Sequence, residues 1–323
     1  MKLSIITINY NNAVGLRKTL ASVASQTYRD IEHIIVDGGS TDGSVDVIRE
    51  YENTIKQSVT IDKPTIHVTW ISEKDNGIYN AMNKGIEIAL GRRVVNSFNR
   101  SELVEDKNKG IRKATGDYVW ILNSGDCAAS PDVVERMINT INSLNVHSLN
   151  NKIGTPILLG NIVKLFPNGK KLRERKMRHA STPKPLAVSM LTFYRGTVPQ
   201  DAAFVRRDLF EKYGLFDDSL KICADWKLYL NIMAMNDVVP MYVDIDVVLF
   251  DMTGISNANV ERRNAEKRAY LEEILPASVL KDYDAYAFPI EQYKRLHKHH
   301  LWRLVYFLER VLFKLEKWHV LNK

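Results

Sequence analysis

Residues 3–8 read LSIITI and residues 31–43 read IEHIIVDGGSTDG. Each apolar run is short and rich in β-branched residues, which is typical of a strand buried on both faces. Between the runs, Asn11 and Asn12 can cap a helix. The apolar positions of that helix recur at helical spacing: Leu16, Leu20, Val23 and Ala24. Strand, helix and strand in succession predict parallel strands joined by helical crossovers.

The same alternation continues through the first 126 residues. Further strands are expected at 66–71 and 118–122, with a helix between them at about 78–90. Ligands of parallel sheets bind at the carboxyl ends of the strands. A polar residue follows each of these ends: Asn9, Asp37, Asp75 and Asp126. We therefore expect these four side chains to converge on one edge of the sheet.

Two glycines follow Asp37 in the turn. Gly38 and Gly39 would let the backbone approach a ligand closely, and the Asp37 carboxylate could accept hydrogen bonds from a nucleobase or ribose. The alternative is an aspartate that only forms the turn and caps the next helix. The dinucleotide-binding fingerprint is excluded, because it requires GxGxxG in the first turn, which here reads NYNN.

Two more aspartates lie where an acid could do chemistry. Asp126 follows Leu-Asn-Ser-Gly at a strand end, and one or two carboxylates suffice for a divalent cation that also binds phosphate oxygens. Asp225 begins an apolar helix expected at 225–235, where the surroundings would raise its pKa toward that of a general base. For both residues the alternative is a helix cap, and spacing alone does not decide.

The second half of the chain is less regular. Residues 151–200 hold several prolines and glycines and a basic stretch, and they carry no clear pattern. Helices are expected at 208–213 and 260–274, and a strand at 242–250. The motif NKGI occurs at 83–86 and again at 108–111, which indicates a local duplication rather than a repeat fold.

Composition narrows the class of protein. The 323 residues are 45% hydrophobic and 26% charged, which favours a globular chain over a disordered one. Two cysteines, Cys127 and Cys223, make neither a disulfide framework nor a zinc pattern. The N-terminus turns polar too early for a signal peptide, and no run of 18 apolar residues predicts a transmembrane helix. We therefore expect a cytoplasmic protein.

The net charge of +7 is concentrated in the tail, where residues 291–323 carry eight Lys or Arg against three Glu. Residues 292–318 place leucines and valines on one helical stripe, with basic residues elsewhere. Such a helix can lie on an anionic membrane, and the alternative is a helix packed on the catalytic domain or a partner. Nucleic-acid binding is not favoured, because exposed aromatic residues are not interleaved with the basic ones.

Four blocks occur in a fixed order: SIITINYNN, IVDGGSTDGS, SEKDNGIYNAMNKGI and ATGDYVWILNSGD. Together they resemble the family 2 inverting glycosyltransferases of the GT-A fold, especially bacterial exopolysaccharide and colanic-acid-type enzymes. The resemblance covers residues 1–135, apart from an insertion at about 92–115, and continues weakly to 256. It implies an α/β fold with a Rossmann-like, mostly parallel central sheet flanked by helices, and a C-terminal helical extension.

The resemblance also implies a nucleotide-sugar site. Its expected members are Asn9, Tyr10, Asp37, Gly39, Asp75, Asn83 and Asn123. Asn123 stands in place of the first acid of the family's metal motif, so Asp126 is the expected ligand of Mg²⁺ or Mn²⁺. Asp225 matches the family's catalytic base.

One departure concerns the acceptor side. Gln200 and Asp201 stand where the family usually has His-Gln, and with Trp226 they are the expected contacts of the acceptor and leaving group. The change would signal altered specificity or impaired activity.

The reaction implied is metal-dependent transfer of a hexosyl or N-acetylhexosaminyl group, with inversion, in cell-surface polysaccharide biosynthesis. The expected donor is a UDP-sugar, and the acceptor a saccharide or a polyprenyl-diphosphate-linked saccharide. Residues 1–126 would bind the donor, 127–256 the acceptor, and 257–323 would form a basic extension at the cytoplasmic membrane face. The alternative is a catalytically impaired sugar-nucleotide-binding or membrane-surface protein. A nucleotidyltransferase would need a glycine-rich loop with a basic residue after the first strand, which NYNNAVG lacks.

Overall fold

The structure is a computed structural model and describes residues 1–58, 65–93, 95, 116–147, 154–174, 183–252, 259–298 and 302–321. It has two compact units: residues 1–190 with 198–267, and residues 191–197 with 268–323. Most of the insertion at 92–115, including nearly all of the second NKGI copy, lies outside the described residues.

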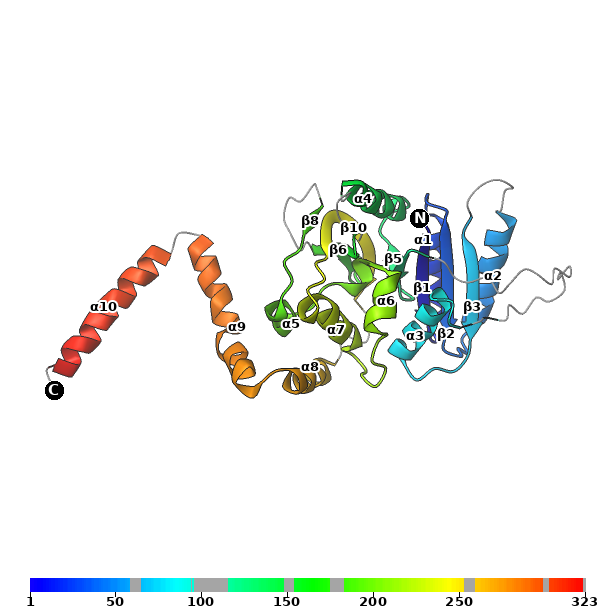
Figure 1. Cartoon of the computed structure of the whole chain (residues 1–323). Helices are drawn as coiled ribbons and strands as arrows, with labels where there is room; N and C mark the ends of the chain where they lie inside the picture. Colours follow the sequence, from blue (N-terminus) through cyan, green and yellow to red (C-terminus); the bar gives the residue numbers. More distant parts are fainter. Residues whose placement is uncertain are drawn as a thin grey trace. The chain divides into compact units, whose positions relative to one another are not determined.

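The first unit is built on one ten-stranded sheet (Figure 1). The strands are β1 (Leu3–Asn9), β2 (Ile31–Asp37), β3 (His67–Ser72), β4 (Tyr118–Ile121), β5 (Cys127–Ala128), β6 (Ile157–Leu165), β7 (Lys171–Glu174), β8 (Lys184–Pro185), β9 (Ala203–Arg206) and β10 (Met241–Asp251). Their order is β3-β2-β1-β4-β9-β6-β10-β5, with β7 beside β6 and β8 beside β10.

Strand direction divides the sheet into two regions. Strands β3, β2, β1 and β4 are parallel, as predicted from their crossovers. Strands β6 and β10 are also parallel, but β9 between β4 and β6 runs antiparallel to both. The sequence pattern missed β6 and β9, which lie in and just after the stretch that showed no clear periodicity.

Helices cover both faces of the sheet. In the first unit they are α1 (Ala13–Ala24), α2 (Ser44–Gln57), α3 (Ile78–Ala89), α4 (Val133–His147), η1 (Gln200–Ala202), α6 (Arg207–Tyr213) and α7 (Ala224–Tyr229). The helix expected at 225–235 is an α-helix only to Tyr229, and it continues as a π-helical turn, η2 (Leu230–Met235). Helix α8 (Val260–Ile274) begins in the first unit.

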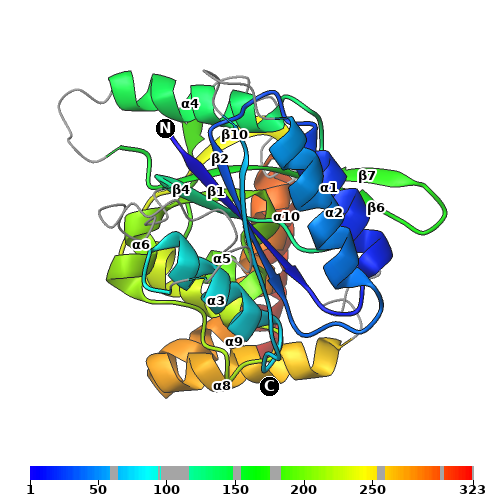
Figure 2. The ribbon, with the colours of Figure 1, turned by 90° about the vertical axis from the view of Figure 1, so that its right-hand side faces the viewer.

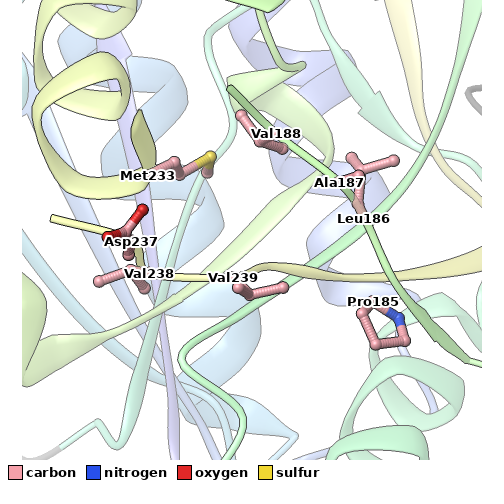
Figure 3. Close-up of a pocket in the computed structure, with 8 residues that line it drawn as sticks. All are labelled: Pro185, Leu186, Ala187, Val188, Met233, Asp237, Val238 and Val239. Atoms are coloured by element: carbon pink, nitrogen blue, oxygen red, sulfur yellow. The ribbon is translucent and has the colours of Figure 1, made fainter. Parts of the chain in front are cut away.

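Alternate residues of β1 pack on opposite faces. Leu3 and Ile5 share a core with Leu16 of α1 and the apolar residues of α2. On the other face, a Cβ added to Gly85 of α3 would lie 2.4 Å from Cγ2 of Ile6, so the helix needs glycine to approach the strand. Figure 2 shows α1 and α2 on one side of β1 and β2, and α3 on the other. Each fully buried isoleucine here contributes roughly 1.5–3 kcal/mol.

The second unit contains α9 (Ala277–Lys298), α10 (Trp302–Leu321) and all of α5 (Met190–Arg195) except Met190. The single stripe expected at 292–318 is therefore shared by two helices, with residues 299–301 outside the described range. Tyr194 stacks on Tyr283, with ring centroids 5.3 Å apart. In the described parts of the chain, no helix is both long and apolar enough to cross a bilayer.

Candidate active site

The end of β2 is organised by the Asp37 carboxylate, which is completely buried. Oδ1 accepts hydrogen bonds from Asn9 Nδ2 at 2.8 Å and Ser40 Oγ at 2.6 Å. Oδ2 accepts from the Ser40 backbone N–H at 2.9 Å and from Ser72 Oγ at 2.7 Å. Burial acts to raise the pKa of Asp37, but these donors outweigh burial and the pKa is lowered. The carboxylate is thus anionic, and its hydrogen bonds hold the turn. Its contact with a nucleoside stays a prediction.

A second carboxylate lies against this turn. A Cβ built on Gly38 would be 2.4 Å from Asp75 Oδ2 and 3.1 Å from Cδ2 of Tyr10. Gly39 has a φ of +79°, a left-handed conformation that strongly favours glycine. Tyr10 is 64% exposed, so its ring and the Asp75 carboxylate are the groups of this loop that a base or ribose could reach.

Asn83 is engaged elsewhere. Its Nδ2 donates to the Phe216 carbonyl at 2.8 Å, and its Oδ1 accepts from the Phe216 N–H at 2.9 Å. Both ends of the amide therefore tie α3 to the segment before α7, and the predicted nucleotide contact of Asn83 stays a prediction.

Asp126 follows β4 at the same edge of the sheet. It is 5% exposed, and its Oδ1 accepts from the Asp251 backbone N–H at 2.8 Å. Burial raises the pKa of Asp126 well above its usual value, and the charges of Asp201 and Asp251 raise it further. Asp251 ends β10, so the charges of acids from two other segments act on Asp126.

Asp201 connects this group to Asp225. Asn123 Nδ2 donates to Asp201 Oδ1 at 3.1 Å. Burial and then the nearby Asp225 charge raise the pKa of Asp201. Burial likewise raises the pKa of Asp225, although the Tyr79 hydroxyl, 2.8 Å from its Oδ1, opposes that shift. Both side chains stay partly exposed, so solvent and ligands can reach them.

The loop after β1 joins the two groups of acids. The Asn11 N–H donates to Ser40 Oγ at 2.8 Å, beside Asp37. Asn12 Nδ2 donates to Ser124 Oγ at 3.1 Å, beside Asp126. The predicted convergence of strand ends is thus seen in the geometry, with Asn9 paired in register with Asp37.

The acidic side chains around Asp126 could bind a divalent cation if a bound ligand supplied some of the coordinating atoms. Asp126, Asp201 and Asp251 concentrate negative charge, and the Asn123 amide oxygen is buried without a hydrogen-bond partner among the described residues. Within the described ranges, no group of three or more His, Cys, Asp or Glu side chains is arranged to hold a metal ion by itself. Mg²⁺ and Mn²⁺ sites of nucleotide enzymes do not need one, because phosphate and water oxygens supply the remaining ligands.

Other predicted residues pack in the interior. Gln200 is buried with its Nε2 3.8 Å from the Met82 sulfur. Trp226 is 2% exposed. Sequence reasoning missed Tyr79, which looked like an ordinary apolar position of an amphipathic helix, and Asp251, which the rule on polar residues at strand ends could have found.

Comparison with known proteins agrees with this geometry. The model described as "Glycosyl transferase family 2" matches residues 4–97, and that described as "Glycosyltransferase like family 2" matches residues 97–302. An uncharacterised glycosyltransferase of Mycobacterium tuberculosis is 27% identical over 255 residues, 79% of this chain and 76% of its own length. The PGL/p-HBAD biosynthesis glycosyltransferase of Mycobacterium bovis is 24% identical over 260 residues, 80% of each chain.

Solved structures of S. aureus TarS share the fold. The TarS 1-349 complex with UDP has a TM-score of 0.54 at 17% identity, covering 88% of this chain and 72% of that one. The complex with UDP-GlcNAc has a TM-score of 0.52 at 17% identity, covering 78% and 58%. This chain spans 41% of a longer TarS structure, whose TM-score is 0.51. The chain belongs to glycosyltransferase family 2 and is a glycosyltransferase of the GT-A fold.

Proposed function

We propose that this enzyme transfers a sugar from a UDP-sugar to a saccharide or lipid-linked saccharide, with inversion, in cell-surface polysaccharide synthesis. The observation that carries the proposal is the set of acids Asp126, Asp201 and Asp225, whose pKa values are all raised at the carboxyl edge of the sheet. The UDP and UDP-GlcNAc complexes of TarS support the choice of donor class.

The nucleoside would lie on the Tyr10 and Asp75 side of the edge. Asp126 would hold Mg²⁺ or Mn²⁺, with Asp251 and the Asn123 oxygen close by. When bound, the cation would offset the charge that develops on the leaving diphosphate. Asp37 and Asn9 keep the turn under the nucleoside rigid.

Asp225 would accept the proton of the attacking hydroxyl. Its raised pKa brings a carboxylate toward the range of an effective general base. The Tyr79 hydroxyl, 2.8 Å from Oδ1, fixes its orientation. Asp201 lies between the proposed metal and base sites, where the family usually has an uncharged glutamine, so it is placed to influence acceptor specificity.

The C-terminal helix α10 would bring the enzyme to an anionic membrane surface. Its exposed apolar side chains follow helical spacing along one face: Leu304, Phe307, Leu308, Val311 and Leu312. Arg303, Arg310 and Lys314 lie on a flank of this face by the same spacing, where they could meet acidic headgroups. An acceptor on a lipid carrier would be found at such a surface.

Cosedimentation with phosphatidylglycerol vesicles tests the membrane proposal. We expect binding that falls in phosphatidylcholine vesicles, at high salt, and in a Phe307→Glu/Leu308→Glu variant. Equal sedimentation of that variant, or no binding by the wild type, would contradict the membrane role and favour a protein partner for α10.

A donor screen tests the catalytic proposal. The purified chain is incubated with UDP-, GDP- and dTDP-sugars, with and without Mn²⁺, and release of nucleoside diphosphate is followed. We expect Mn²⁺-dependent release from a UDP-sugar that increases with a suitable acceptor. Nucleoside diphosphate binding without any turnover would instead favour a catalytically impaired protein.

A further inference from the structure

Helix α8 begins beyond the region that the sequence assigned to catalysis, yet it is fastened to the segment that carries Asp225. The Glu266 carboxylate accepts three consecutive backbone N–H groups. Oε1 lies 3.0 Å from the N of Lys221, and Oε2 lies 3.0 Å and 3.1 Å from the N atoms of Ile222 and Cys223. A carboxylate that accepts several backbone N–H groups fixes them strongly, because charged acceptors roughly double the strength of a hydrogen bond.

The same segment is held from a second helix. The Tyr79 hydroxyl of α3 lies 2.5 Å from the Ile222 carbonyl oxygen as well as 2.8 Å from Asp225. The Cys223 thiol donates to the Arg263 carbonyl of α8 at 3.3 Å. The loop that leads into α7 is thus clamped between α3 and α8, and Asp225 lies at the first turn of α7.

The residue after Glu266 faces the same place. The Lys267 ammonium lies 5.1 Å from the centre of the Trp226 ring, next to Asp225 in sequence. Lys267 is largely surrounded by protein, and burial lowers its pKa while the charges of Cys223 and Asp225 oppose that shift. Lys267 therefore supplies a positive charge that acts on the proposed base.

We infer that α8 is a working part of the active site, with Glu266 as a positioning residue for the loop that sets Asp225 and Lys267 as a cation packed on the neighbouring Trp226 ring. This inference rests on the proposed role of Asp225 as the base. It extends the catalytic machinery past residue 256, to the end of the first compact unit at Lys267.

The titratable groups around Asp225 come from several elements. They are Tyr79 of α3, Asp201 of η1, Cys223 and Tyr229 at the ends of α7, and Lys267 of α8. Among them Lys267 lowers the pKa of Asp225, against the larger effect of burial. Removing its charge should therefore raise that pKa and protonate the base at a higher pH.

The first test compares Glu266→Ala with Glu261→Ala, an exposed glutamate on the same helix. We expect kcat to fall about 10- to 100-fold in Glu266→Ala, since small displacements of a catalytic group carry costs of this size. The Kd for UDP with Mn²⁺ should stay within about twofold, because the Glu266 carboxylate bonds to residues 221–223 and Arg262 rather than to the turns after β1 and β2. Glu261→Ala should behave as the wild type. Unchanged kcat in Glu266→Ala, in an active enzyme, would overturn the positioning role.

A second readout does not depend on turnover. Cys223 is 1% exposed in the clamped loop, whereas Cys127 lies outside it. Thiol labelling followed by mass spectrometry should show faster modification of Cys223, but not of Cys127, in Glu266→Ala. Equal labelling in both proteins would mean that Glu266 does not hold the loop, whether or not the enzyme transfers sugar. If Cys223 is labelled faster in Glu266→Ala as expected, but the wild type transfers no sugar, the proposed function fails while the positioning role of Glu266 stands.

The pH profile tests Lys267. In Lys267→Met the acidic limb of the pH profile of kcat should move to higher pH. In Lys267→Arg, which keeps the positive charge, the limb should lie where it does in the wild type. An unmoved limb in Lys267→Met would remove Lys267 from the site.

Discussion

The turn after β2 and the acids around Asp126 lie at one edge of the sheet, yet their carboxylates titrate in opposite directions. Asp37 has no solvent-exposed surface, yet its pKa is lowered because four hydrogen bonds stabilise its charge. Burial raises the pKa values of Asp126, Asp201 and Asp225, neighbouring acids raise those of Asp126 and Asp201 further, and the available donors do not offset these effects. The number of donors, rather than burial alone, therefore separates a carboxylate that holds structure from one available for a cation or a proton.

The largest effect is expected at Asp225. Asp225→Asn removes the proposed base, so kcat should fall by about 10²–10⁴-fold, the usual contribution of a positioned base. UDP binding measured by calorimetry should not change. Asp218→Asn, at an exposed site seven residues earlier, is the control. Near-normal turnover in Asp225→Asn would remove Asp225 from this role.

Chemical denaturation of the Asp37→Ala and Asp201→Asn variants tests this contrast between the two kinds of carboxylate. Asp37→Ala removes the acceptor of the buried Asn9 amide and of the Ser40 and Ser72 donors and should cost roughly 1–3 kcal/mol of unfolding free energy. Asp201→Asn keeps an acceptor for Asn123 and removes a repelling charge, so stability should stay equal or rise at pH 8. A larger loss from Asp201→Asn than from Asp37→Ala would reverse the comparison.

His33 offers a third environment, a buried group kept neutral. Its ring nitrogens lie 3.0 Å from Thr7 Oγ1 and 2.8 Å from the Tyr51 hydroxyl, and burial lowers its pKa from 6.5 to about 3. The unfolded chain binds this proton below pH 6.5 and the folded chain does not. Stability should thus fall by about 1.4 kcal/mol for each pH unit below 6.5, down to about pH 3.

Denaturation of the wild type and His33→Gln between pH 4 and 8 isolates this contribution. The variant should lose less stability than the wild type as the pH falls. The acids with raised pKa values act with the opposite sign, since they cost stability as the pH rises above their unfolded values. Parallel curves for the two proteins would contradict the neutral state of His33.

The smallest effect is expected at Gly38. Gly38→Ala would place a Cβ against the Asp75 carboxylate and the Tyr10 ring. Both can move aside, so the melting temperature should change little while the Kd for UDP rises about 3- to 10-fold, near 1 kcal/mol. Gly196→Ala is the control, with its nearest neighbour 3.9 Å away. An unchanged Kd would exclude the Tyr10 and Asp75 side as the nucleoside site.

The sequence alone predicted the part of the fold that depends on apolar periodicity and on helical crossovers between parallel strands. Strands β1 to β4 and helix α3 match their predicted ranges within about two residues. Asn12 caps α1, as expected, by accepting from the Gly15 N–H at 3.1 Å. The order of strand ends then predicted that Asn9, Asp37, Asp75 and Asp126 would converge.

The remainder depends on contacts between distant segments. Strand β9 has four residues and is defined by its neighbours β4 and β6. The sequence could not show that Ser72, from another strand, completes the hydrogen bonds of Asp37. Glu266 gave no signal of its role, since the backbone N–H groups that it accepts lie more than 40 positions away.

The central claim is that the acids around Asp126 bind a divalent cation together with a diphosphate. It is tested most directly by calorimetric titration of UDP into the wild type and Asp126→Ala, each with Mn²⁺ and with a chelator. We predict that Mn²⁺ tightens UDP binding to the wild type at least tenfold and leaves the variant unchanged. The same Mn²⁺ effect in both proteins would contradict the account.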